Sequence, residues 1–338
     1  MGFRRSDDED IMNDIRIYYR DVRRNESRSD ITDIVESATI STSINAGAGK
    51  CELSIVGDGA SFNFGSCVNV YSGENEVFRG YLFSVSMRDD ERFNATFYDQ
   101  TRYLRNADCI VYKNITVSQL FKDICDKYDL ETGTIDESEY LLPPTVAEGR
   151  SLWDMLQEGI SAESAYKKRQ FVIRDNAGAL EFRDIENLRT DFIIDDEGVA
   201  MGFDFTRGID KRTYNRIKIG FENDKQQARE WEILDNSEYI GEWGVLQFYS
   251  LLKERIDRND LKERCRQQLA LLCWPTTDAR ISCLGDFRIS SGSGVMLNLK
   301  KIQAFNGMSG FYVTSCEHHI SSDIHTMDLT LAVDNFGG

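Results

Sequence analysis

The three histidines of the chain, His318, His319 and His325, fall within eight residues of one another. Imidazole nitrogens ligate metal ions and serve as general acids or bases near neutral pH. With Cys316 two residues before them, two imidazoles and a thiolate could bind zinc, but no fourth ligand is visible. We therefore expect these histidines to be packed and hydrogen-bonded within the fold, with no metal bound.

The residues around the histidines alternate as the two strands of a hairpin, FYVTSCEHH and HTMDLTLAV. A two-residue turn at Ser321-Ser322 would place His318 opposite His325, on the face that carries Cys316 and Met327. The rings would then pack on apolar neighbours while their nitrogens form local hydrogen bonds.

Two short motifs suggest nucleotide or acyl chemistry, and both are incomplete. Asn45–Lys50 ends in Gly-Lys, but a Walker loop needs Gly and a hydroxyl where Ile44 and Cys51 stand. A hairpin turn explains this segment better. Ser164–Lys167 matches the SxxK of penicillin-recognising enzymes, but the KTG and SDN partners of that motif are absent.

Neighbouring carboxylates occur at Asp195-Asp196 and at Glu137 and Glu139, and glycosidases use such pairs. With 57 acidic residues in the chain, such pairs are expected on any solvated surface. No pattern has the specificity of HExxH, GxSxG or a Cys-His nucleophile pairing. We predict no catalytic, cofactor-binding or metal-binding residues, and hence a protein that is not an enzyme.

The cysteines show no CxxC pairing, and we expect them to be buried, reduced thiols. They are Cys51, Cys67, Cys109, Cys125, Cys265, Cys273, Cys283 and Cys316. No apolar run approaches the roughly 18 residues of a membrane helix, and the N-terminus lacks the apolar core of a secretory signal. Met1-Gly2 with Ser6 fits a myristoylation pattern, but an acidic run follows. We expect a protein made and assembled in the cytoplasm, without a membrane partner.

Length and composition favour a chain of two or three domains that folds nearly throughout. It has 338 residues, 41% of them hydrophobic and only three proline. Its formal net charge of −17, from 40 Lys+Arg and 57 Asp+Glu, repels phosphate backbones. Sequence-specific recognition of nucleic acid is therefore disfavoured.

Residues 38–99 are rich in short strand patterns, namely ATISTSI, KCELSIV, CVNVY, EVFRGYLFSVSM and RFNATFY. In KCELSIV the apolar Cys51, Leu53 and Ile55 alternate with Glu52 and Ser54, as in a half-buried antiparallel strand. This region is predicted to form a small barrel or sandwich.

The pattern then becomes helical. Thr116 and Gln119 have capping-box spacing, and apolar residues recur at helical spacing over Val117–Tyr128. A second amphipathic helix should start at Ser151, and a hairpin should turn at Asp175–Gly178.

After residue 191 strand patterns return, interrupted by one helix from Asp260 to about Cys273. The fold class is therefore α+β and mostly β, with two β-barrel or sandwich domains flanking and enclosing a mixed α/β middle domain. The predicted segments are an N-terminal acidic arm (1–30), a first β domain (31–100), the middle domain (101–190) and a second β domain with the inserted helix (191–338).

Seven segments in this order, over about residues 30–335, resemble the baseplate hub family of contractile phage tails, PBSX-like prophages and diffocin-type bacteriocins. The terminal segment is the most characteristic. The seven segments are GDGASFNFGSCVNVYSGENEVFRGYLFSV, TFYDQTRYLRN, DNAGALEF, YNRIKIGF, GEWGVLQFYSLL, CLGDFRISSGSGVML and VTSCEHHISSDIHTMDLTLAV.

The resemblance implies a homotrimer whose two tube-like β domains per chain form a pseudo-sixfold ring. One face of the ring would receive the hexameric tail tube protein and the other the trimeric central spike protein, next to other baseplate proteins. Tape-measure protein or DNA would pass through the lumen without specific binding. Tube docking is expected at two strand segments, with candidate assembly contacts Glu76, Phe78, Arg79, Tyr81, Met296, Asn298, Lys300 and Lys301.

Alternative functions are a tail-associated cell-wall hydrolase and a distal-tail or tail-lysin anchor protein of a non-contractile phage. The sequence lacks a lysozyme-like or peptidase region after Val333, which disfavours wall digestion. Three copies would carry a formal charge of −51, which either keeps the lumen from adhering to its cargo or provides ordinary solubility.

Overall fold

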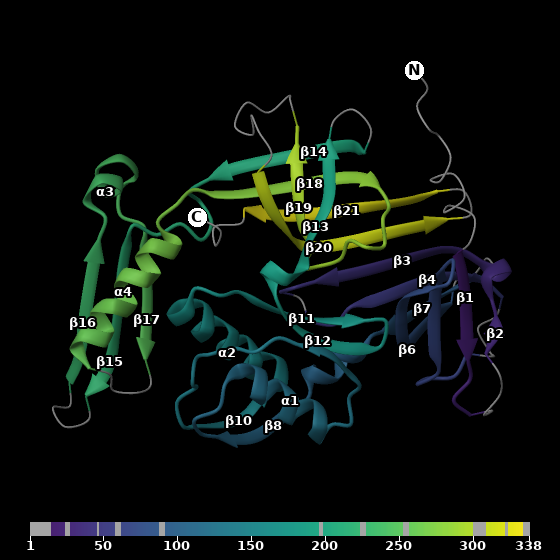
Figure 1. Ribbon diagram of the computed structural model, residues 1–338, viewed down its shortest axis with the longest axis horizontal. Helices are drawn as coiled ribbons and strands as arrows, with labels where there is room; N and C mark the ends of the chain where they lie inside the picture. Colours follow the sequence, from purple (N-terminus) through teal and green to yellow (C-terminus); the bar gives the residue numbers. More distant parts are fainter. Residues whose placement is uncertain are drawn as a thin grey trace. The chain divides into compact units, whose positions relative to one another are not determined.

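A computed structural model describes residues 15–23, 28–45, 47–57, 62–87, 92–195, 199–223, 228–252, 257–299, 309–321 and 324–333 (Figure 1). The chain divides into two compact units. Unit 1 comprises Met1–Glu163, Arg169–Asp204 and Ala279–Gly338, and unit 2 comprises Ser164–Lys168 and Phe205–Asp278. Unit 2 has a hydrophobic core of its own.

The chain is mostly β, and one large sheet that curls into a half-barrel organises unit 1 (Figure 1). Among the described residues thirteen strands belong to it, and β19 (Gly294–Asn298) bridges β20 and β13 (Arg189–Asp195) beside the main path. The main path runs in the order β14 (Ala200–Gly208), β18 (Thr276–Leu284), β21 (His325–Val333), β20 (Ser309–Ser321), β3 (Val35–Ser43), β4 (Lys50–Val56), β7 (Arg92–Tyr98), β6 (Asn75–Met87), β5 (Cys67–Ser72), β1 (Ile15–Arg20) and β2 (Ser29–Asp30).

The pairing of β20 with β3 joins the C-terminal strands to the N-terminal strands. The two run antiparallel, with Ser315 opposite Ser43, His318 opposite Ile40 and Ser321 opposite Ser37. The two β regions, predicted as separate domains, therefore share one sheet. Strand periodicity identifies each strand but not its distant partner, which is why the sequence did not indicate this pairing.

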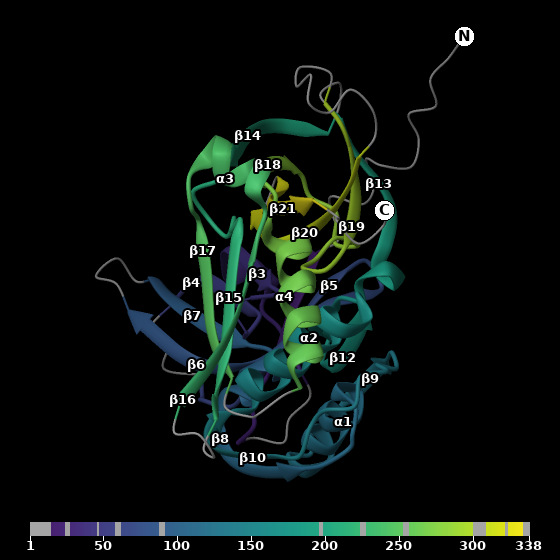
Figure 2. The same ribbon diagram turned by 90° about the vertical axis from the view of Figure 1, so that its left-hand side faces the viewer.

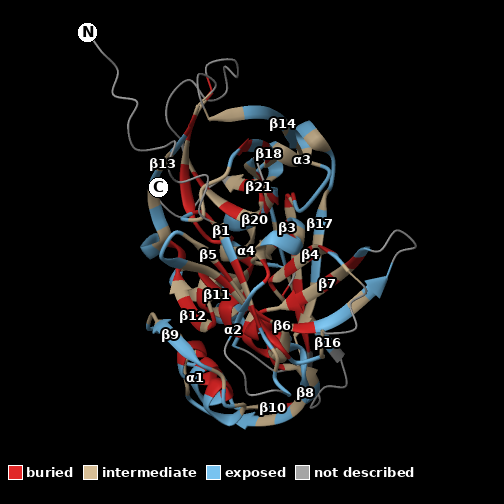
Figure 3. Ribbon diagram, turned by 90° about the vertical axis from the view of Figure 1, so that its right-hand side faces the viewer, coloured by how far each residue is buried: buried red, intermediate tan, exposed pale blue. Residues whose placement is uncertain are grey.

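Alternation along the strands gives the large sheet one buried apolar face (Figure 3). In β4, Cys51, Leu53 and Ile55 are buried while Glu52 and Ser54 are partly exposed, which confirms the predicted alternation. The core on this face also contains Ile17, Ile40, Val68, Val70, Leu82, Phe93 and Phe97.

The N-terminal segment contributes to this sheet. β1 pairs with β5 and places Ile17 and Tyr19 in the core. The interpretation of residues 1–30 as an acidic arm is therefore wrong for β1 and β2, while residues 1–14 lie outside the described part of the chain. Three short 3₁₀ helices connect strands: η2 (Thr32–Ile34), η3 (Gln100–Arg105) and η4 (Ile185–Leu188).

The middle segment of unit 1 contains both predicted helices. α1 (Val117–Lys127) has the predicted capping box between Thr116 and Gln119, and Ser151 caps α2 (Leu152–Lys167) by accepting from the Asp154 amide. Two small sheets accompany them, β8 (Ala107–Tyr112) with β10 (Thr145–Ser151), and β9 (Thr132–Ile135) with β12 (Ala179–Asp184) and β11 (Phe171–Asn176). The β11–β12 hairpin turns where predicted.

Unit 2 is a three-stranded sheet covered on one face by a helix (Figure 2). Its strands are β16 (Ala228–Asp235), β15 (Arg216–Asn223) and β17 (Gln247–Leu252), with α3 (Ser237–Trp243) between β16 and β17 and α4 (Arg258–Leu272) after them. The predicted helix starting at Asp260 is confirmed to within two residues. The segment 191–338 was predicted as one domain, but residues 205–278 form most of unit 2.

Seven of the eight cysteines are buried, and burial raises the pKa of the Cys125 and Cys283 thiols to about 12. Cys109 is exposed, opposite Glu148 on the two-stranded sheet, so the expectation of burial is wrong for this residue. Across the described ranges, no helix is both long and apolar enough to cross a membrane.

Phe121 on α1 is fully buried, with its ring centroid 5.6 Å from that of Phe182. Replacing Phe121 with Ala should cost about 3–5 kcal/mol of unfolding free energy, because the removed ring leaves a cavity. Val111→Ala is the control, since its side chain is 70% exposed and should cost less than about 0.5 kcal/mol. Urea unfolding measures both, and an unchanged midpoint for Phe121→Ala would contradict the packing.

Candidate assembly surface

Glu76 and Arg79, two predicted contacts on β6, are bound to neighbours within unit 1. Arg79 Nη2 lies 2.8 Å from Glu76 Oε2, and Arg79 Nη1 lies 3.4 Å from an oxygen of Glu131 beside β9. Burial raises the pKa of Glu76, but hydrogen bonds from Arg79 and Asn69 outweigh it and hold this pKa below its ordinary value. These two side chains link the large sheet to the middle segment.

Phe78 and Tyr81 lie on opposite faces of the same strand. Phe78 is only 5% exposed and shares the inward face with Leu82, so its prediction as an exposed contact is wrong. Strict alternation along β6 accounts for this, because Phe78 and Leu82 are four residues apart. Tyr81 points to the other face and is partly exposed.

The second predicted segment contains β19. Met296 and Asn298 are partly exposed and alternate with the buried Val295 and Leu297. Lys300 and Lys301 lie outside the described residues.

An aromatic patch surrounds Tyr81, and the sequence did not indicate it. Its members are Tyr81, Phe83, Tyr98, Tyr103 and Arg102. The ring of Phe83 lies 5.4 Å from that of Tyr98 and 6.1 Å from that of Tyr103, with the Arg102 guanidinium 5.3 Å above it. Phe83 is 36% exposed. Tyr and Arg dominate the energetic centres of protein interfaces, so this aromatic patch has the composition of a docking surface.

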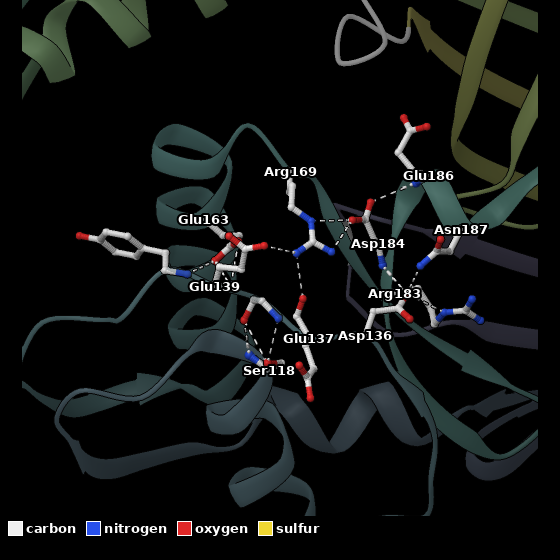
Figure 4. Close-up of polar contacts among 12 residues, drawn as sticks. Ser118, Asp136, Glu137, Glu139, Glu163, Arg169, Arg183, Asp184, Glu186 and Asn187 are labelled. Atoms are coloured by element: carbon white, nitrogen blue, oxygen red, sulfur yellow. Dashed lines mark hydrogen bonds and ion pairs between the residues drawn. The ribbon is translucent and has the colours of Figure 1, made fainter.

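Residues 136–140 are held by polar side chains from α1, α2, β12 and η4 and by Arg169 (Figure 4). Asp136 accepts from Arg183 Nε at 3.0 Å, and Arg169 Nη2 lies 2.8 Å from Asp184. Arg169 also donates to the Glu137 carbonyl at 3.0 Å. These carboxylates are neutralised by arginines that fix the loop.

Glu163, fully buried on α2, is the central acceptor of this loop. Its carboxylate accepts from the amides of Glu139 at 3.1 Å and Tyr140 at 2.7 Å (Figure 4). The Glu139 carboxylate lies 3.6 Å from Arg169, so Glu137 and Glu139 are used for anchoring and do not form the opposed pair of a glycosidase.

A second pair of carboxylates, Asp99 and Asp175, joins η3 to the β11–β12 hairpin. Asp99 accepts from the Thr101 amide at 3.0 Å and Asp175 from the Gln100 amide at 3.1 Å. Burial raises the pKa of both groups, that of Asp175 to about 6. Such shifts occur at catalytic sites, but Asp99 is only 4% exposed and both groups are bound by backbone amides.

The histidine hairpin has a different register from the predicted one. His318 lies opposite Met327, and His325 lies opposite Ile320, because four residues separate Ile320 from His325. The rings of His318 and His325 still meet diagonally, with His318 Nδ1 3.0 Å from His325 Nε2. Gly285 makes room for the His325 ring, since a Cβ there would overlap it.

The remaining contacts of the two rings are local. His318 Nε2 lies 3.0 Å from the Ile289 carbonyl and 3.2 Å from Cys316 Sγ, and Phe287 stacks on His325 at 4.1 Å. Burial lowers the pKa of both His318 and His325 to about 4. The two histidines are therefore neutral near pH 7 and act as packed, hydrogen-bonded elements of the core.

The chain is similar to a known protein family and to several solved structures. The family model described as YqbQ-like matches residues 38–332. This chain belongs to the YqbQ-like family. A member, Uncharacterized protein YqbQ of Bacillus subtilis (strain 168), is 22% identical over 265 residues, which cover 77% of this chain and 78% of that protein.

Solved structures share the fold of this YqbQ-like chain over nearly its whole length. The 43 kDa tail protein of prophage MuSo2 from Shewanella oneidensis has a TM-score of 0.69 at 10% identity, covering 94% of this chain and 98% of its own. The tail protein from Neisseria meningitidis MC58 has a TM-score of 0.69 at 12% identity, covering 95% and 97%. The E. coli c3393 protein, a type VI secretion component described as similar to T4 tail proteins gp27 and gp5, has a TM-score of 0.57 at 11% identity, covering 90% and 75%.

Glu163→Ala should destabilise the protein by about 2–4 kcal/mol, because the amides of Glu139 and Tyr140 lose the buried carboxyl group that accepts their hydrogen bonds. Glu158→Ala on the same helix is the matched control. Glu158 is paired with Arg150 and its side chain is 63% exposed, so its loss should cost less than about 1 kcal/mol. Equal unfolding midpoints for the two variants would contradict the anchoring role of Glu163.

Lowering the pH from 7 to 5 should destabilise the fold through His318 and His325. An unfolded histidine titrates near pH 6.5, whereas these titrate near 4. The unfolded chain thus binds more protons in that window, and stability falls as the pH drops through it, by on the order of 2 kcal/mol for His318 at pH 5. Urea unfolding at both pH values measures the loss.

The matched variants for this pH test are His325→Gln and His319→Gln. His319 has a 43% exposed side chain and lies outside the buried pair, so His319→Gln should keep the part of the loss that comes from His318 and His325. His325→Gln should reduce it. Asp99 and Asp175, whose raised pKa values act in the opposite direction, are common to all variants. An undiminished loss in His325→Gln would refute the assignment.

Proposed function

We propose that this protein is a structural baseplate component, the hub of a contractile phage tail or phage-tail-like bacteriocin. Three copies would form a ring that adapts the hexameric tail tube to the trimeric central spike. The observation that carries the proposal is a fold shared end to end with two tail proteins, covering 94–95% of this chain and 97–98% of theirs. Membership of the YqbQ-like family and the fold shared with the c3393 protein support the same role.

The large sheet suits such a role. A ring subunit must present two surfaces to its neighbours, and the sheet that continues through the β20–β3 pairing offers an extended surface for one of them. In the proposal, two separate groups of residues contact the tail tube: Tyr81 with the rest of the aromatic patch, and the partly exposed Met296 and Asn298 of β19. Tail tube, spike and other baseplate proteins are the proposed partners, and assembly takes place in the bacterial cytoplasm.

The proposed role is not enzymatic. The two solved structures most similar in fold above are described as tail proteins, which supports the prediction that the chain is not an enzyme. The carboxylates and histidines that could have carried chemistry are bound to backbone amides, arginines and each other. A hydrolase role would instead give zymogram activity that a carboxylate substitution removes.

Mass photometry and analytical ultracentrifugation test the proposal. The purified protein should form a trimer, alone or on adding the spike protein, and the trimer should dissociate on dilution because its stability is coupled to protomer concentration. Adding the tail tube protein should give a complex with one hub trimer per tube hexamer. A strict monomer at about tens of micromolar, unchanged by both partners, would refute the hub role.

A further inference from the structure

Among the described residues of unit 2, a helix covers only one face of the three-stranded sheet. α4 packs on the other face, where Ile217, Ile219 and Phe221 of β15 meet Leu261 and Cys265. The alternate residues of the three strands form the opposite face, here named the open face. Its apolar and basic members are Lys218, Trp231, Ile233, Tyr249 and Leu251.

Aromatic side chains span the middle of the open face. Gly220 of the central strand lies opposite Trp231, and a Cβ at Gly220 would overlap the indole, so the ring lies directly on the backbone. Trp231 lies 5.3 Å from the ring of Tyr249 on the far strand, and Lys218 Nζ lies 4.7 Å above Trp231. These contacts pack Lys218, Trp231 and Tyr249 against one another across the three strands.

The open face is accessible. Ile233 is 50% exposed and Tyr249 is 51% exposed. Apolar patches of about 300–600 Å² on folded proteins are often functional. Trp and Tyr with an adjacent basic side chain are the residue types that dominate binding energy at such sites.

The charge distribution along the chain indicates what the open face would bind. Unit 2 contains 15 Lys+Arg and 13 Asp+Glu, so the rest of the chain contains 25 Lys+Arg and 44 Asp+Glu. Unit 2 is thus slightly basic, while unit 1 carries a formal charge of −19. Opposite potentials favour association and suppress contact between like surfaces. In a mixture of identical chains, the acidic partner available to unit 2 is unit 1 of another copy.

We propose that the open face of unit 2 docks on unit 1 of a second copy of this chain. This contact is heterologous, since two different surfaces meet, and repeated contacts of that kind close into rings. The proposal rests on the proposed trimeric hub and adds the surface through which its subunits meet.

The open face is smaller than a stable protein interface. Three strands about 4.8 Å apart and some eight residues long cover roughly 300 Å². A stable interface buries about 800 Å² on each partner, so the open face would be the apolar centre of a wider contact made by charged residues. The ion pair of Arg216 with Asp235 lies at one end of the open face and belongs to this charged margin. Association should therefore weaken as salt is added.

The test compares Ile233→Asp with Leu271→Asp in the full chain. Leu271, 42% exposed on α4, lies on the helix that covers the other face and receives the same charge, so it is a matched control. Sedimentation over a concentration series should show the apparent dissociation constant raised at least about tenfold by Ile233→Asp and little changed by Leu271→Asp. Tyr249→Ser should act like Ile233→Asp, and unfolding curves check that each variant folds.

The outcomes separate this inference from the hub role. If the wild type assembles and both Ile233→Asp and Tyr249→Ser assemble equally well, the docking inference is overturned while the hub role stands. If the open-face variants lose binding to the tube or spike protein but keep self-association, the face belongs to that protein and the inference is again overturned. A wild type that remains monomeric with every partner overturns the hub role itself.

Discussion

Unit 1 depends on the antiparallel pairing of β20 with β3. This pairing spans Ser315–Ser321 and Ser37–Ser43 and joins strands that are nearly the whole chain apart. It lets the buried faces of the N-terminal and C-terminal strands form one apolar surface, from Leu53 and Phe97 to Met327 and Leu329. Since a sheet edge left unpaired would expose backbone donors and acceptors, the pairing also removes two edges at once.

Local sequence patterns predicted what depends on neighbouring residues. The structure contains four such predicted features: the capping box at Thr116, the alternation in β4, the β11–β12 turn and the helix near Asp260. Each follows from residues within one or two turns of chain, where helical and strand periodicity act directly. The order of these elements is a property of the sequence, and the fold that they form is shared with solved tail proteins.

Local patterns could not predict which distant strands pair or the exact register in which they pair. Three features depend on which strands pair and on the length of a turn. They are the division of the chain at unit 2, the strand Ile15–Arg20 and the diagonal contact of His318 with His325. For the candidate contacts, alternation alone would have placed Phe78 inside. Nothing local shows that Arg79 reaches Glu131, or that Phe83 meets Tyr103, because their partners come from other elements.

The distance in sequence between β3 and β20 also governs how the chain is made. Roughly 265 residues separate the two strands, and ribosomes add about 5–20 residues per second, so one edge of β3 waits roughly 15–50 s for its partner. During that interval the nascent chain exposes a strand of Ser, Thr and Ile to other nascent chains on the same message. Because β3 pairs with a strand made much later, folding of unit 1 requires translation through β20, and chains that terminate before β20 expose an open edge of β3 on which other chains can aggregate.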